Sequence, residues 1–331
     1  MNKIPRVVII GGGTGTYVSL MGLKKYPLRL TAVVTMSDSG GSSGKLRDEL
    51  GVLPPGDLRQ CLVALAESSR LLREMFNYRF EEGTLKGHSF GNIFLSTLAK
   101  QTGSMKKAIS EVGKILRIKG NVIPSTFTKS DLCVDLEDGI KIIGETHIDV
   151  VEKKEKRAKI IKAYLQPKAT VNEDAKIAIE KADFILIGPG DLYTSIIPNL
   201  LVKGMPGVIK NSKAKKIFVM NLMTKYGQTT RYTAKGHLKD LEKYLGKNII
   251  DYILINSKMP RRNTLFWYEE FEEYPVKDDL RSPKNIKIIR KNLIKDLIIP
   301  KEKSDELRRS IIRHDSEKLA VETMGIINNL I

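Results

Sequence analysis

The sequence predicts an α/β fold in which a mostly parallel β-sheet is covered by helices on both faces. Short β-branched apolar runs alternate with longer stretches in which apolar residues recur every three or four positions, as in consecutive βα units. The chain has 331 residues, which is too long for one small core and suits one large α/β domain or two domains. We expect a single domain that spans residues 1–331.

The N-terminal part of the chain contains the clearest βα pattern. Residues 6–11 (RVVIIG) and 28–36 (LRLTAVVTM) are apolar runs of strand length and are predicted to form the first two strands. Helical spacing follows each of them. The predicted helices cover residues 15–27, 56–80 and 87–103, and Gly103 is placed to end the last of them.

The middle of the chain has a different pattern, because its apolar residues alternate instead of recurring at helical spacing. Asp138 and Gly139 form a typical hairpin turn, so a small antiparallel β insertion is expected at about residues 120–165. The βα pattern then returns. Strands are expected within 182–205, 215–224 and 252–258. A C-terminal segment at about 260–331, with short strands and a terminal helix, is expected to complete a ligand cleft.

The formal net charge of +18 raises the question of an anionic partner, since 56 Lys and Arg residues face 38 Asp and Glu residues. The lysines are spread along the chain, and aromatic residues make up only 6% of it. No helix-turn-helix, zinc-finger or RNA-binding signature is visible. A solvated basic surface is therefore favoured over a nucleic-acid partner.

The cysteines and the apolar runs indicate the cellular compartment in which the protein is expected. Cys61 and Cys133 are the only cysteines, too few for a disulfide framework or a metal-ligand cluster. The apolar runs are far shorter than a membrane span, and the N-terminal run of four apolar residues before the glycines is too short for a signal peptide. These features predict a cytoplasmic protein without a membrane span.

A glycine-rich turn follows the first predicted strand and opens into a helix. Its residues Gly12, Gly13, Thr14 and Gly15 predict a phosphate group nearby, because glycine allows close backbone approach and helix N-termini attract anions. The spacing is an incomplete dinucleotide fingerprint, with Tyr17 at a position that favours a small residue, and no P-loop Gly-Lys-Ser/Thr is present. A tight turn without a ligand remains the alternative.

A long glycine-serine loop with acidic residues follows the second predicted strand. Asp38, Ser39, Gly40 and Ser42 are expected to form a second ligand wall at the carboxyl edge of the sheet. Asp57 follows a Pro-Pro-Gly turn and is either a helix cap or a ligand or metal contact.

Polar residues at other predicted element ends extend the candidate site. Histidine at a helix entrance is either an acid-base group or part of a hydrogen-bond network. Glycines, amides and a tyrosine at strand ends are expected to face the same cleft. These additional candidates are His88, Asn92, Gly188, Gly190, Tyr193, Asn221 and Asn256.

Long, ordered motifs connect the chain to a known family. VVIIGGGTGTYVSLMGLK, MSDSGGSSGKLRDELGVLPPGDLRQCLVALA, GHSFGNIFLSTL, GPGDLYTSIIPNLL and RHDSEKLA lie between residues 7 and 320. The chain resembles the bacterial gluconeogenesis factor family, the UDP-sugar-binding branch of the 2-phospho-L-lactate transferase superfamily. The resemblance implies a Rossmann-like three-layer α/β/α sandwich. It also implies UDP-sugar binding at Tyr268 and Arg313.

The same resemblance implies a non-catalytic regulatory protein that binds UDP-N-acetylglucosamine and requires no cofactor. Such proteins serve growth and cell shape on gluconeogenic carbon and link it to cell-wall precursor synthesis, with the hexosamine-forming aminotransferase as one proposed partner. The sequence contains no catalytic nucleophile motif, which is consistent with a non-catalytic role. The sequence departs from the family pattern at Gln228, Gly236 and Asp191, which leaves the preferred sugar open.

An enzymatic alternative comes from the sister branch, which transfers a phospholactyl group from a nucleoside diphosphate conjugate with magnesium. Asp38, Asp57 and Asp191 would supply the carboxylate oxygens that Mg²⁺ prefers. Magnesium is expected only under this alternative. Homo-oligomer formation is left open by the sequence.

Overall fold

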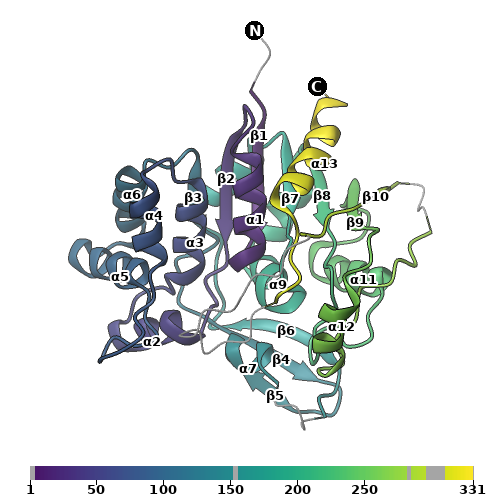
Figure 1. Ribbon diagram of the computed structural model, residues 1–331, viewed down its shortest axis with the longest axis horizontal. Coiled ribbons are helices and arrows are strands. Elements are labelled where there is room, and N and C mark those ends of the chain that lie inside the picture. Colours follow the sequence, from purple (N-terminus) through teal and green to yellow (C-terminus); the bar gives the residue numbers. More distant parts are fainter. Residues whose placement is uncertain (1–3, 152–155, 282–284, 296–309, 331) are drawn as a thin grey trace.

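The fold is built on a seven-stranded sheet whose strands all pair in parallel. A computed structural model describes residues 4–151, 156–281, 285–295 and 310–330. The strand order is β10-β9-β8-β7-β1-β2-β3 (Figure 1). The strands are β1 (Arg6–Gly11), β2 (Arg29–Val34), β3 (Asn121–Pro124), β7 (Phe184–Ile187), β8 (Lys215–Val219), β9 (Tyr252–Asn256) and β10 (Lys287–Lys291).

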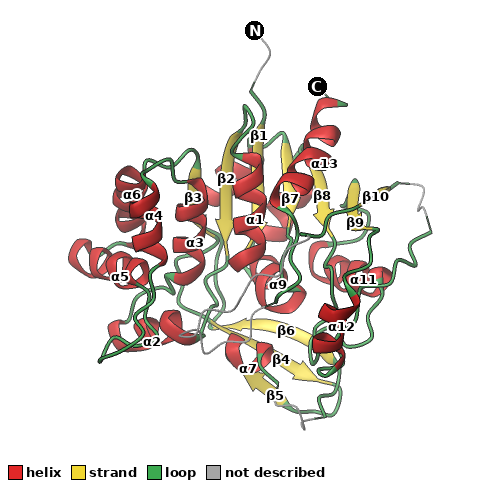
Figure 2. Cartoon of the chain, viewed as in Figure 1, coloured by secondary structure: helices red, strands yellow, loops and turns green. Residues whose placement is uncertain are grey.

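Helices cover both faces of this sheet, so the predicted three-layer α/β/α architecture is confirmed (Figure 2). Successive residues of a strand point to opposite faces, and in β1 Val7 and Ile9 belong to one core while Val8 and Ile10 belong to the other. The first core includes α1 (Gly13–Leu23), α3 (Gly56–Leu65), α5 (Phe90–Thr102), α6 (Met105–Leu116) and α13 (Ser316–Asn328). The second core includes α8 (Glu173–Glu180), α9 (Ile197–Leu201), α10 (Met205–Asn211) and α11 (Ala234–Leu245).

A small antiparallel sheet, in the order β5-β4-β6, lies beyond the carboxyl ends of the parallel strands (Figure 1). Gly139 has φ +89° in the turn between β4 and β5, as expected for a hairpin glycine. The insertion begins later than the predicted residue 120, because β3 joins the parallel sheet beside β2. Its elements are β4 (Asp131–Leu136), β5 (Lys141–Ile143), α7 (Glu145–Asp149) and β6 (Ile160–Gln166).

Three elements differ from the sequence-based prediction. The glycine-serine loop contains a helix, α2 (Gly41–Leu50). The predicted helix 56–80 is divided into α3 and α4 (Arg70–Asn77), because Ala66 leaves the helix to pair with Ile118. Helix α12 (Arg262–Glu269) was not predicted, whereas strand β10 agrees with the short strands expected in the C-terminal segment.

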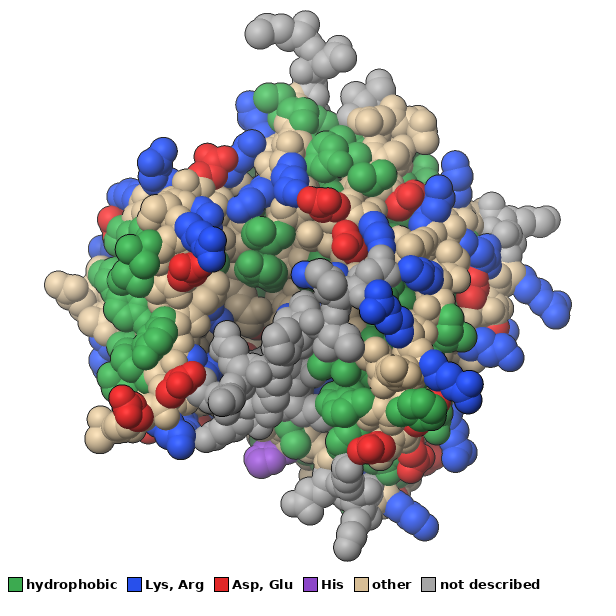
Figure 3. All heavy atoms as spheres, in the orientation of Figure 1, with side chains coloured by type: hydrophobic (Ala, Val, Ile, Leu, Met, Phe, Trp, Pro, Cys, Tyr) green, Lys and Arg blue, Asp and Glu red, His purple; other side chains and the backbone are tan. Residues whose placement is uncertain are grey.

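The molecular surface carries mixed charges on the face shown in Figure 3, where Lys and Arg side chains are interspersed with acidic and apolar ones. Within the described ranges, none of the helices combines the length and apolar character needed to cross a membrane.

Candidate functional site

The turns at the carboxyl ends of β1, β2, β7 and β8 open into one cavity of about 240 Å³. This is the edge at which open α/β sheets bind ligands. Helix α7, helix α12 and the segment before α13 complete its walls. The cavity is lined by these residues that the sequence singled out: Gly12, Gly13, Thr14, Gly15, Asp38, Gly40, Ser42, Asp57, Asn92, Gly190, Asn221, Tyr268 and Arg313.

The glycines of the first turn are required by close packing within the protein. A Cβ on Gly12 would lie 2.5 Å from Oδ2 of Asp57, and a Cβ on Gly15 would lie 2.1 Å from the Pro189 carbonyl oxygen. Asp57 lies in the first turn of α3, whose N-cap position is occupied by Pro55. The turn after β1 is therefore locked between the turn after β7 and the start of α3.

The start of α2 forms a second wall of the cavity. Ser42 Oγ accepts a hydrogen bond from Asn92 Nδ2 at 3.2 Å and lies 3.2 Å from Nδ1 of His88. Ser39 Oγ accepts from the Thr146 backbone N–H at 3.0 Å. Contrary to the prediction, His88 and Ser39 do not line the cavity. Their side chains contact Ser42 and Thr146 and so support this wall.

Arg59 on α3 holds this wall together, and the sequence analysis missed it. Its side chain is 8% exposed, and Nε donates to Oδ1 of Asn92 at 2.9 Å. A second donor, Nη1, reaches Oδ1 of Asn77 at 2.5 Å. Two side-chain amides therefore fix the guanidinium at the edge of the cavity, where Arg59 is one of the lining residues.

The turn after β7 leads into a π-helical turn, η1 (Leu192–Ile196). Asn221 Nδ2 donates to the Gly190 carbonyl at 2.8 Å, and Thr194 and Ser195 line the cavity. Tyr193 was expected in the cleft but is fully buried, with its hydroxyl donating to Asp240 Oδ2 at 2.6 Å. The reason is that neighbouring residues of a helical turn face different directions.

Two further candidates lie outside the cavity lining. Gly188 adopts φ +80° and is close to the Val219 carbonyl, so it shapes the turn instead of facing the cleft. The Asn256 side-chain oxygen accepts from the Leu293 backbone N–H at 3.1 Å and connects β9 with the C-terminal segment. Gly188 and Asn256 therefore do not line the cavity, and their contact with a ligand stays a prediction.

The C-terminal wall is held by Tyr268, which is 1% exposed. Its hydroxyl oxygen accepts from the backbone N–H groups of Ile311 and Ile312, each at 3.0 Å. Burial raises the pKa of this phenol, so it stays neutral. Tyr268 therefore positions the segment that places Arg313 and His314 in the cavity lining.

Acidic residues line the middle and the α12 side of the cavity. Burial, followed by the charges of Asp38, Asp149 and Asp57, raises the pKa of Glu145 well above its usual range. Burial also raises the pKa of Asp191 to about 6, against the opposing charge of Lys225. Lys225 Nζ lies 3.3 Å from Oδ1 of Asp149 and 3.8 Å from Oδ2 of Asp191.

The three-carboxylate magnesium site is not assembled in this arrangement. Asp191 faces Lys225, whereas Asp38 and Asp57 lie against Gly56 and Gly12. In the described part of the chain, no group of three or more His, Cys, Asp or Glu side chains is placed to hold a metal ion. The donor set therefore does not fit that proposal.

His314 lies in the wall with 7% of its surface exposed. Burial lowers its pKa to about 4, while a hydrogen bond to the Met220 backbone acts in the opposite direction. The folded protein thus holds a neutral imidazole at a pH where a histidine in the unfolded chain, with a usual pKa of about 6.5, takes up a proton.

We expect acid to destabilise the protein through His314. Between pH 6.5 and pH 5 the unfolded chain binds more protons at this position, so the free energy of unfolding should fall by about 1.5 kcal/mol. Urea titrations of the wild type and His314→Gln at both pH values measure the difference. The exposed His147→Gln variant serves as control and should follow the wild type. Equal pH dependence in all three proteins would contradict the assignment.

Comparison with known proteins agrees with the fold. The family model described as 2-phospho-L-lactate transferase CofD matches residues 7–294. The chain belongs to the CofD family. The predicted resemblance to gluconeogenesis factors is also confirmed. The gluconeogenesis factor of Bacillus subtilis is 38% identical over 321 residues, 97% of each chain. That of Halalkalibacterium halodurans is 45% identical over 258 residues, 77% of this chain and 79% of the relative.

One solved structure is similar to this chain over nearly its whole length. The crystal structure of a Bacillus halodurans protein superimposes with a TM-score of 0.88 at 38% identity, covering 97% of this chain and 100% of that one. The cavity therefore lies in a part of the fold that the relative shares.

Several cavity residues escaped the sequence analysis because they do not follow a strand. They lie in helices, in the antiparallel insertion or in connecting segments further along the chain. Three of them, Lys45, Arg59 and His314, lie within the long family motifs, which was the signal that could have found them. The missed residues include Lys45, Arg59, Arg79, Glu145, Asp149, Lys225, Glu273 and His314.

Proposed function

We propose that the protein is a non-catalytic regulatory protein that binds a UDP-sugar, with UDP-N-acetylglucosamine as the first candidate. The observation that carries this proposal is the single cavity at the carboxyl edge of the parallel sheet. Thirteen of the residues predicted from the sequence as ligand contacts line it, from Gly12 to Arg313. This location is typical of nucleotide sites in α/β folds.

The chemistry of the walls suits a nucleoside diphosphate sugar. The starts of α1 and α2 face the cavity, and helix N-termini favour anionic groups. Arg313 and Lys225 add positive charge from the C-terminal side, and Arg guanidinium groups bind phosphate or carbonyl oxygens. Carboxylates and hydroxyls in the middle of the cavity are suitable partners for sugar hydroxyl groups.

The regulatory role rests on the relatives named gluconeogenesis factor. We extend it to growth and cell shape on gluconeogenic carbon and to the supply of cell-wall precursors in the cytoplasm. The hexosamine-forming aminotransferase is the proposed protein partner. A bound UDP-sugar would report precursor supply to that partner.

A transferase acting on a nucleoside diphosphate conjugate is the second candidate, because the matching family model is described as a transferase. Incubation with magnesium and candidate diphosphate donors tests it through release of the nucleoside monophosphate. Steady release would establish an enzyme. Binding without release would support the regulatory protein.

Calorimetric titration with UDP-N-acetylglucosamine, UDP-glucose and NAD tests the main proposal. We expect heat with at least one UDP-sugar and none with NAD. Binding of NAD alone would replace the UDP-sugar site with a dinucleotide site.

Arg313→Ala should weaken UDP-sugar binding about tenfold, because one charge-assisted hydrogen bond is lost. The melting temperature should stay close to that of the wild type, since Arg313 is only half-buried. Arg29→Ala removes an exposed cation at the start of β2, at the opposite edge of the sheet, and should leave binding unchanged. Equal affinities for the two variants would remove Arg313 from the site.

A further inference from the structure

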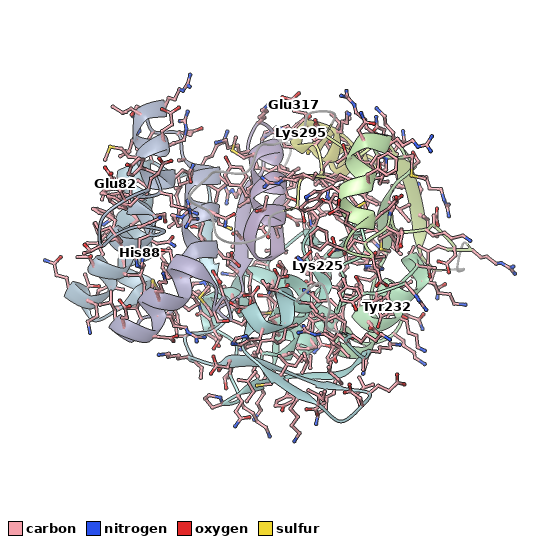
Figure 4. All side chains as sticks on the ribbon, turned by 60° about the horizontal axis from the view of Figure 1, so that its bottom comes forward. Glu82, His88, Lys225, Tyr232, Lys295 and Glu317 are labelled. Atoms are coloured by element: carbon pink, nitrogen blue, oxygen red, sulfur yellow. The ribbon has the colours of Figure 1, made fainter. Side chains whose placement is uncertain are left out.

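Charge is divided along the cavity. Asp149, Asp191 and Glu273 lie with Lys225 at the end near α12. The opposite end, beside α2 and α5, is lined by three cations, and the Asp38 carboxylate there accepts a hydrogen bond from the Gly40 backbone N–H at 2.9 Å. Figure 4 shows His88 and Lys225 on different sides of the region beneath the sheet. The cations at the α2 end are Lys45, Arg59 and Arg79, and we call this part of the cavity the basic end.

Arg59 gives the basic end a fixed positive charge. The side chain is 8% exposed, and Nε and Nη1 bind Asn92 and Asn77 at 2.9 and 2.5 Å. Nη1 also lies 3.4 Å from the Phe76 carbonyl oxygen, so three protein acceptors hold the guanidinium in place. Its orientation is therefore set before any ligand arrives, which lowers the ordering cost of binding.

Lys45 and Arg79 reach the same place from different elements. Lys45 is exposed on α2 and makes no ion pair with any of the described residues. Arg79 Nη1 donates to the Gly87 carbonyl at 2.6 Å. Burial lowers the pKa of His88, and the charges of Lys45 and Arg79 lower it further while Glu49 opposes them. The positive charges of Lys45 and Arg79 thus both lower the pKa of the His88 imidazole, which lies beside Ser42.

The start of α2 adds backbone donors to these side chains. Gly41, Ser42 and Ser43 line the cavity, and no side chain caps the helix at Gly40. The first N–H groups of a helix have no partner within the helix and attract anions. Backbone amides and three cations therefore surround one end of a partly enclosed cavity.

We propose that the basic end is an anion subsite that binds a phosphate group through Lys45, Arg59, Arg79 and the first amides of α2. This places the anion contact at the start of α2, whereas the turn after β1 already packs against the carboxylate of Asp57. Two sources share this chemistry. One is the diphosphate of the nucleotide sugar, which rests on the proposed function, and the other is a separate phosphorylated small molecule bound beside it.

Pyrophosphate titrated at low ionic strength is the direct probe of this subsite. Lys45→Gln and Arg79→Gln should each weaken binding about tenfold, and the affinity should fall less steeply with salt in each variant. Arg59 is left intact because it also holds Asn77 and Asn92. Arg70→Gln removes an arginine with a side chain 86% exposed on α4 and should bind like the wild type.

Unchanged pyrophosphate affinity in both cavity variants, with melting temperatures equal to the wild type, would overturn the subsite. So would a wild-type protein that gives no heat with pyrophosphate. A variant that melts early is replaced by the charge-conserving Lys45→Arg or Arg79→Lys, which should retain most of the affinity.

Competition identifies the source of the phosphate. Displacement of pyrophosphate by UDP-N-acetylglucosamine would assign the basic end to the diphosphate of the nucleotide. Simultaneous binding would assign it to a second, phosphorylated ligand, and both results support the subsite. Pyrophosphate binding without any UDP-sugar binding would refute the proposed function and leave the subsite standing.

Discussion

Gly15→Ala is expected to lower the free energy of unfolding by about 3 kcal/mol or more. A Cβ at this position would lie 2.1 Å from the carbonyl oxygen of Pro189 and 2.5 Å from its carbonyl carbon. Both atoms belong to the backbone, so no side-chain rotation relieves the overlap. The turns after β1 and β7 must separate, and urea denaturation measures the cost.

The same substitution is also expected to abolish ligand binding, because these two turns form adjacent walls of the cavity. Gly325→Ala is the matched control. Nothing lies within 4 Å of a Cβ at Gly325, and replacing an exposed helical glycine should stabilise the protein by about 1 kcal/mol. A Gly15→Ala protein as stable as the wild type would show that the two turns are not locked together.

Asp240→Ala should cost about 3 kcal/mol of stability. Its carboxylate accepts hydrogen bonds from the hydroxyls of Tyr193 and Tyr232, each at 2.6 Å, and it is 8% exposed. Removing it leaves two phenol groups without an acceptor in a largely buried setting, and each such loss costs about 1 to 3 kcal/mol. Denaturant titration gives the value.

The loss should extend to ligand binding, because Tyr193 belongs to the π-helical turn that presents Thr194 and Ser195 to the cavity. Tyr232→Phe removes only one of the two hydrogen bonds and should cost about 1 kcal/mol. Asp138→Ala, at an exposed hairpin turn, should change stability and binding little. Equal stabilities for Asp240→Ala and Asp138→Ala would refute the role of this network.

The strands of the parallel sheet were largely predictable because burial on both faces gives continuous apolar runs. Helix α2 was not, since its sequence GSSGKLRDEL has the composition of a loop. Contacts with other elements stabilise it instead: Ser42 Oγ accepts from Asn92 Nδ2 of α5 at 3.2 Å, and Arg47 Nη1 donates to Asp131 Oδ1 of β4 at 2.8 Å. Strand β10 lies in the segment where short strands were expected, but its bounds were not predicted because it is an edge strand whose residues are mostly exposed.

The candidate site was predictable where residues directly follow a parallel strand. Asp38, Gly190 and Asn221 reach the cavity for this reason. Tyr193 and Asn256 show the limit of the rule, because backbone position does not determine side-chain direction or partner. This rule did not predict the basic end, because the cations there come from α2, α3 and the segment after α4.

The close packing of α13 on α1 determines when the cavity is completed during protein synthesis. A Cβ on Gly22 would lie 2.0 Å from the Ser316 carbonyl oxygen, so the start of the last helix rests directly on the first one. A nascent chain exposes this surface of α1 on the ribosome until α13 has been translated. Arg313 and His314 precede α13 directly, so this wall of the cleft forms only after the chain up to α13 has emerged.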